Sequence, residues 1–341
     1  MFTPLMGRAL TRGPAPEEAR FPASTRTAVL ALFLAVVTSP SAWAASEHHF
    51  YDAWHAPRAA DFAQASQPLA PAVQALCVAS PEGTEVALEK ARAAWRDALL
   101  AWESLSAVAL GPVLEGRYQR LIDFTPTRPA MIEKAIRSAP ATLADMERIG
   151  TPAKGFPALE WLLWTRPVQP DSPACTYATR VAEELGREAA GLAQARLQVP
   201  VSLDERVNQW VGGLERLRWS DMEMPARVAL TSSARLAPDY PRRASGAVAS
   251  AWAVRWRALK FLATGPQSLV TALREKNQTA AAQALVAAVA QADAAMQAVA
   301  VEDFATVLAA GKALAALKAQ VENQVAPALG VNIGFSDADG D

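Results

Sequence analysis

The sequence is poor in the side chains that bind transition metals or act as nucleophiles. Its 341 residues include only two cysteines, Cys77 and Cys175, and three histidines, which lie near one another as His48, His49 and His55. No histidine lies within sequence reach of either cysteine, and no His-Glu-x-x-His motif occurs. A metal–thiolate site, a nucleophilic cysteine and the common zinc-peptidase motif are therefore disfavoured.

The chain also lacks an excess of charge and a membrane-spanning apolar run. Its 33 Lys and Arg residues nearly balance its 34 Asp and Glu residues, so it has no basic footprint for nucleic acid. The apolar run Ala28–Val37 is too short to cross a bilayer, and no later stretch resembles a transmembrane helix. We therefore expect neither a nucleic-acid partner nor an integral membrane protein.

The apolar run has the pattern of a secretory signal peptide. Arg20 and Arg26 precede it, and the small-residue segment Ala42–Ala44 follows it as a cleavage site. We expect residues 1–44 to be removed by cleavage after Ala44, which predicts a periplasmic protein.

Export gives the two cysteines a role. In an oxidising compartment Cys77 and Cys175 can pair, and this is the role that we favour. The disulfide would close a loop of roughly a hundred residues, worth ~4–5 kcal/mol in the chain-entropy model.

Strand patterns are absent as well, and the sequence favours helices. Alanine dominates, aromatic residues are few apart from ten Trp, and no hairpin dipeptide separates alternating runs. Apolar spacing predicts helices over 47–79 with kinks at Pro57 and Pro68, 84–110, 129–138, 140–147, 174–198, 202–218, 246–264, 279–299 and 301–326. The proline-interrupted segment 219–245 is expected to be irregular. We expect an all-α protein with two helical bundles, 45–199 and 200–341.

The run Gly155–Trp164, GFPALEWLLW, places one carboxylate among apolar side chains. Proline suits the first position of a helix, so Pro157 is expected to begin one, with Glu160 in the first turn. Glu160 could compensate the helix dipole there, but a helix that is apolar all round is buried. A buried carboxylate needs a partner, a metal ion or a proton, and Arg117 and Arg120 are candidate partners.

This run resembles the signature of the imelysin family of exported bacterial proteins, also classed as M75 peptidases. In that signature, Gly-x-His-x-x-Glu is followed by an aromatic residue and Leu-Leu. Other segments are similar to family segments in the same order: the pair Cys77 and Cys175, Ala101–Pro112 (AWESLSAVALGP), Arg120–Phe124 (RLIDF), Pro241–Gly246 (PRRASG) and Gly334–Asp341 (GFSDADGD). The resemblance implies two four-helix-bundle-like domains packed together, with a site between them.

The sequence departs from the signature at its histidine, which is replaced by Pro157. A His and a Glu three residues apart on one helix face can chelate a metal ion, whereas proline has no ligand atom. Zinc is therefore not expected, and an oxygen-rich site would suit iron or calcium better. With Gly155 and Pro157 as motif residues, the candidate ligand residues are Glu160, Glu103, Arg117, Asp123, Arg243, Ser245, Asp339 and Asp341.

Each of these candidates also has a plainer interpretation. Glu103 beside Trp102 is typical of a rim residue, Arg243 of a solvated loop, and the tail aspartates imitate only part of a calcium loop. Arg242 and Arg243, together with Ser245, could instead hold an anion.

The resemblance implies a family that includes proteins linked to iron uptake, to polysaccharide binding and to proteolysis. We consider three functions for this chain. We favour a periplasmic protein that binds iron, another metal or a small anionic ligand between its bundles, alongside iron-uptake proteins of the cell envelope. The alternatives are a metallopeptidase of the M75 type, disfavoured by Pro157, and a structural or interaction protein without a working cleft.

Overall fold

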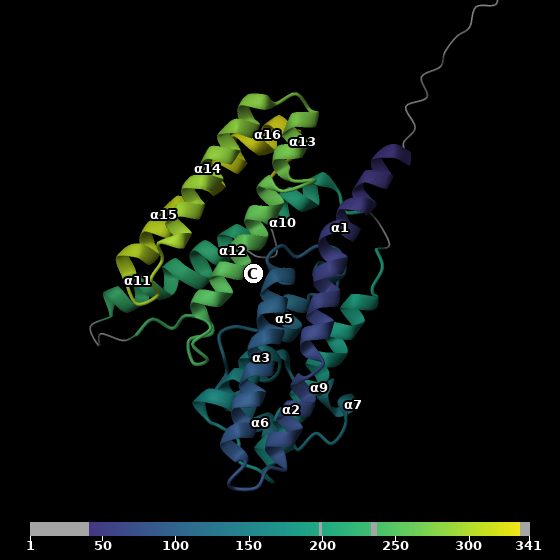
Figure 1. Ribbon diagram of the computed structural model, residues 1–341, viewed down its shortest axis with the longest axis vertical. Coiled ribbons are helices and arrows are strands. Elements are labelled where there is room, and N and C mark those ends of the chain that lie inside the picture. Colours follow the sequence, from purple (N-terminus) through teal and green to yellow (C-terminus); the bar gives the residue numbers. More distant parts are fainter. Residues whose placement is uncertain (1–40, 198–199, 233–236, 335–341) are drawn as a thin grey trace, which may run out of the picture. The chain divides into compact units, whose positions relative to one another are not determined.

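The computed structural model describes residues 41–197, 200–232 and 237–334, and this part of the chain contains helices and no strand (Figure 1). The predicted all-α fold is confirmed. The helices of the first half are α1 (Ser41–Ser66), α2 (Leu69–Cys77), α3 (Thr84–Ser106), α4 (Pro112–Glu115), α5 (Tyr118–Ile122), α6 (Pro129–Ser138), α7 (Leu143–Met146), the 3₁₀ turn η1 (Thr151–Ala153), α8 (Gly155–Glu160), the π-helix η2 (Trp161–Thr165) and α9 (Pro173–Gln194).

The second half is helical as well. Its helices are α10 (Leu203–Glu215), the π-helix η3 (Arg216–Glu223), α11 (Met224–Thr231), α12 (Val248–Thr264), α13 (Leu269–Glu275), α14 (Thr279–Gln297), α15 (Phe304–Gln320), the π-helix η4 (Val321–Val325) and α16 (Ala326–Leu329).

The prediction that 219–245 is irregular is wrong for residues 219–231. The helix that begins with α10 continues through η3 and α11 to Thr231. Pro225 does not end it, although a proline inside a helix removes one backbone N–H donor; it stands directly after the π-helix η3, as the second residue of α11. Helix α13 is also absent from the predicted set; Ser268 caps it by accepting a hydrogen bond from Thr271 N.

Buried apolar side chains form two clusters. In the first half α1 and α2 each pack against both α3 and α9, around Phe62, Trp95 and Trp102. In the second half α10 packs against α12 and α15, and α14 packs against the same two helices. Helix α3 also packs against α12, so the two clusters adjoin. The domain limits 45–199 and 200–341 stay a proposal.

The second cluster draws on residues of the first half. Trp54 of α1 is buried in it and stacks on Phe261, with ring centroids 5.4 Å apart. Val108 and Leu110, which follow α3, belong to it as well. The two halves are thus joined by apolar packing before any polar contact is considered.

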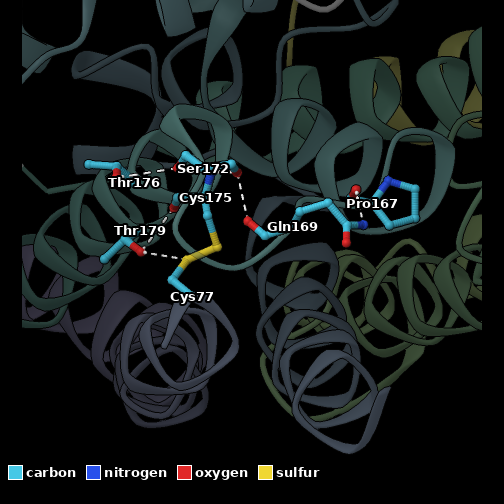
Figure 2. The surroundings of a disulfide bond; sticks show 7 residues. All are labelled: Cys77, Pro167, Gln169, Ser172, Cys175, Thr176 and Thr179. Carbon is cyan, nitrogen blue, oxygen red and sulfur yellow. Dashed lines mark hydrogen bonds between the residues drawn. A yellow bond between two sulfur atoms is a disulfide. The ribbon is translucent and has the colours of Figure 1, made fainter. Parts of the chain in front are cut away.

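A disulfide closes the first half, as predicted. Cys77 at the end of α2 is bonded to Cys175 in the first turn of α9, with their Cα atoms 5.5 Å apart (Figure 2). The first turn of α9 is held by its cap, because Ser172 Oγ accepts a hydrogen bond from Cys175 N at 3.1 Å. Asp171 N also donates to Cys77 O at 3.0 Å, so backbone and disulfide fix the same junction.

One described segment, Phe304–Leu329, is long and apolar enough to cross a membrane, with a mean hydropathy of 1.3. Core helices of folded proteins pass the same test. This segment packs Val307, Leu314 and Leu317 into the second cluster, and its Lys318 pairs with Glu322 at 2.9 Å. Its length and composition alone do not assign it to a membrane.

Candidate functional site

The segment that carries Glu160 begins with a backbone conformation that requires glycine. Gly155 has a φ of +73°, and a Cβ atom there would lie 2.3 Å from Ile122 O. This close approach fixes α8 against the end of α5. Pro157 is the third residue of α8, not the first as predicted, and Glu160 is its last, beyond the first turn. Proline is tolerated because the first four N–H groups of a helix have no partner within it.

Glu160 is buried and is held by neutral donors from the second half. Its Oε1 accepts hydrogen bonds from Ser245 N at 2.9 Å and from Ser245 Oγ at 2.7 Å. Ser245 lies in the turn that precedes α12, where Arg242 and Gly246 both have positive φ, of 70° and 68°. The carboxylate therefore contacts a serine, whereas Arg117, suggested above as a partner, is exposed at the start of α5.

A second buried carboxylate, Glu103 of α3, lies between two guanidinium groups. Glu103 Oε1 accepts from Arg242 Nε at 3.3 Å and from Arg242 Nη2 at 3.2 Å, and its Oε2 accepts from Arg255 of α12. The three side chains are almost completely buried. Burial alone would lower the pKa of both arginines, but their carboxylate neighbours outweigh it and raise the pKa.

Asp123, after α5, extends this cluster. It accepts hydrogen bonds from Arg242, from Arg216 Nη2 at 3.2 Å and from Trp102 Nε1 at 3.2 Å. Burial would raise the pKa of Asp123, but Arg242 and Arg216 lower it below its usual range. Asp123 is therefore a fixed negative charge at neutral pH.

The π-helix η3 contributes two residues, Arg216 and Asp221, to this cluster. Residues five apart in a π-helix lie about one turn above each other, so Arg216 and Asp221 share a face. Asp221 accepts a hydrogen bond from Arg255 Nη1 at 2.6 Å. Burial raises the pKa of Asp221 and outweighs the lowering effect of Arg255 and Arg216. We call Glu103, Asp123, Asp221, Arg216, Arg242 and Arg255 together the charge cluster.

A small hollow opens within the charge cluster. It has room for about one water molecule. Its charged lining consists of Glu103, Asp221 and the three arginines Arg216, Arg242 and Arg255, and Trp252 forms part of the wall. Because the hollow is so small, only a small ligand or a single group of a larger one fits it as it stands.

The structure brings some of the predicted site residues together and separates others. Glu103 and Asp123 meet in the charge cluster, and Glu160 and Ser245 meet beside it. Arg243 is partly exposed and lies 3.5 Å from Glu302. Asp339 and Asp341 fall outside the described residues.

Three cluster residues were absent from the sequence analysis: Arg216, Asp221 and Arg255. Arg242 was considered only with Arg243 as part of an anion site, and the structure pairs it with Glu103 and Asp123. A signal for Arg255 exists in the sequence, since Trp252, Trp256 and Leu259 define an apolar stripe that includes position 255. Nothing comparable in the sequence indicates which of Arg242 and Arg243 is buried in the cluster, because this depends on the positive φ of Arg242.

The donor set does not fit a resident metal ion. The carboxylates of the charge cluster already face guanidinium groups, and Glu160 is bonded to Ser245. In the described ranges, no three His, Cys, Asp or Glu side chains converge in a way that could hold a metal. His55 is fully buried on α1, and burial and Arg58 lower its pKa to about 4.

Comparison with known proteins gives both a family and two related folds. The family model described as Imelysin (peptidase M75) matches residues 55–331. No curated protein matches the chain. An imelysin-like protein from Psychrobacter arcticum 273-4 has a TM-score of 0.64 and 21% identity, covering 86% of this chain and 98% of that one.

The second solved structure is described as an iron-regulated protein A precursor, from Parabacteroides distasonis ATCC 8503. It has a TM-score of 0.68 and 15% identity, and the match covers 85% of this chain and 96% of that one. At these identities the two structures establish the fold.

Proposed function

Because the chain belongs to the imelysin family, we propose that it is an exported, non-catalytic binding protein that serves iron acquisition in the cell envelope. The basic, apolar and small-residue order of residues 20–44 supports export. The disulfide suits an oxidising compartment. The name of the Parabacteroides distasonis neighbour supports a link to iron.

We propose that the protein is non-catalytic because its buried carboxylates are already paired with other side chains. A catalytic metal needs several protein ligands and an open position. Here Pro157 replaces the histidine of the motif, Glu160 is bonded to Ser245, and Glu103 lies between Arg242 and Arg255. These groups hold one another, so neither Glu160 nor Glu103 is positioned as a general base.

The same pairing defines the ligand class. A bare metal ion would have to displace guanidinium groups from Glu103 or Asp123, which is costly because each is buried. A ligand that carries its own negative charge, such as iron chelated by carboxylates, meets the arginines of the charge cluster instead. We propose that iron is bound in such a chelate.

Growth under iron limitation tests this function. A deletion strain should grow more slowly than its parent when iron is chelated, and a plasmid copy should restore growth. Fractionation should recover the protein from the periplasm, shortened by about the length of a signal peptide. Equal growth of the deletion strain and its parent at every iron level would refute the iron function.

A protease assay tests the absence of catalysis. The purified protein should not cleave casein with zinc, iron or calcium added. Cleavage that depends on metal and is lost in Glu160→Gln would overturn the non-catalytic assignment, since that variant keeps the hydrogen-bond acceptor that faces Ser245.

A further inference from the structure

Guanidinium groups line the hollow in the charge cluster on several sides. Arg216, Arg242 and Arg255 carry ~15 N–H groups in all, and the structure gives six hydrogen bonds from them to carboxylates. All three arginines line the hollow, so a group placed in it lies beside guanidinium N–H donors.

The charges around the hollow also favour an anion. Three guanidinium groups line it against two carboxylates, Glu103 and Asp221, while Asp123 is not part of the lining. An anion in this position would meet three guanidinium groups and two carboxylates, and it would gain N–H donors on several sides.

From the size of the hollow and its three guanidinium groups, we infer that it binds one small, negatively charged atom. This inference rests on the proposed function, because it assigns the point at which an anionic iron chelate is held. The atom is either a free halide ion or one carboxylate oxygen of a larger ligand. Each presents a compact negative charge to the same donors, and the hollow has room for about one water molecule.

Arg216 is the residue that tests the site with least damage to the fold. Its side chain is 15% exposed, and it forms one ion pair, with Asp123. Arg242 and Arg255 each hold two buried carboxylates, so changing them endangers folding. Arg218 is a matched control two residues away on η3, because it pairs with Glu215 and Glu223 and does not line the hollow.

The experiment uses the purified mature chain in sodium HEPES buffer, whose sulfonate group is bulkier than the atom inferred for the hollow. Sodium bromide, chloride, formate and acetate are titrated at constant ionic strength, and binding is followed by calorimetry and by the melting temperature. We expect saturable binding of at least one of these anions. Arg216→Gln should weaken it at least tenfold, and Arg218→Gln should leave it within twofold of the original chain.

Crystals soaked in bromide locate the ion. An anomalous peak within reach of Arg216, Arg242 and Arg255 supports the site, and saturation by formate or acetate as well as halide shows that it accepts a carboxylate. No saturable binding of any of the four anions would overturn the inference, as would equal binding by Arg216→Gln or a bromide peak elsewhere. Anion binding together with normal growth of the deletion strain would refute the iron function and leave this site standing.

Discussion

Two buried glutamates join the halves of this protein in different ways. Glu103 of α3 lies between Arg242 and Arg255, both of which carry full charges. Glu160 at the end of α8 accepts hydrogen bonds from two neutral donors, the backbone N–H and the hydroxyl of Ser245. Both carboxylates are buried, so the difference lies in the partner and not in the exposure.

This difference predicts different costs when each contact is broken. Removing one partner of a buried ion pair leaves an uncompensated charge, which is strongly destabilising. Removing a neutral donor from a carboxylate loses one hydrogen bond, which lowers the free energy of unfolding by less than the loss of an ion-pair partner does. We therefore expect the ion pairs of Glu103 to contribute more to the free energy of unfolding than the contact of Glu160.

The largest expected effect is that of Arg242→Met. This change leaves Glu103 and Asp123 facing one guanidinium group fewer, and we expect a loss of about 3–5 kcal/mol in the free energy of unfolding. Arg243→Met is the matched control, since Arg243 is partly exposed and its ion pair with Glu302 is long, at 3.5 Å, and it should change stability by less than about 0.5 kcal/mol. Urea denaturation measures both, and similar values would show that the cluster does not hold the halves together.

The next effect concerns the backbone that presents Glu160. Gly155→Ala adds a Cβ atom 2.3 Å from Ile122 O at a φ of +73°. We expect a loss of about 2–4 kcal/mol from strain and overlap. Gly186→Ala on α9, where nothing lies within 4 Å of the added atom, should be neutral or stabilising. A mild effect at Gly155 would mean that α8 can shift without cost.

Much of the fold, and less of the site, could be predicted from the sequence. The helices, the disulfide and the burial of Glu160 follow from apolar spacing, two cysteines and one carboxylate in an apolar run. The partners of that carboxylate do not. Ser245 is 85 residues away in sequence, and it faces Glu160 only because the turn before α12 adopts positive φ at Arg242 and Gly246.

The charge cluster was harder to predict because it depends on a π-helix. Arg216 and Asp221 share a face only at the wider spacing of η3, whereas α-helical spacing would separate them. The sequence also favoured a helix end near residue 218, which hid the second half of this pair. Helix continuation through Pro225 is a tertiary effect that local propensity does not report.

The third prediction uses pH to separate paired charges from neutral contacts. Asp123→Asn should cost about 2–3 kcal/mol at pH 7, because Arg242 and Arg216 lose a buried partner. The pKa of Asp123 is lowered below its ordinary value of 3.8, so its stabilising effect is complete above pH 3.8 and is lost as the pH falls through the lowered pKa. The gap between the two chains should thus be constant from pH 5 to 8 and narrow below about pH 3.8. A gap that stays constant in acid would place the effect in packing, not in charge.

The smallest expected effect belongs to Glu160→Gln, and it tests the comparison most directly. The amide oxygen of Gln can accept the same two hydrogen bonds from Ser245, so only the charge is lost, and we expect a change of about 1 kcal/mol or less. The same substitution at Glu103 removes the charge that faces Arg242 and Arg255 and should cost about 3 kcal/mol or more. Because the two substitutions are chemically identical and both sites are buried, the difference between their unfolding free energies isolates the partner. Equal losses would mean that Glu160 also depends on a charged neighbour. That neighbour would be Arg242, because Glu160 raises the pKa of Arg242 and Glu103 is paired with the same arginine.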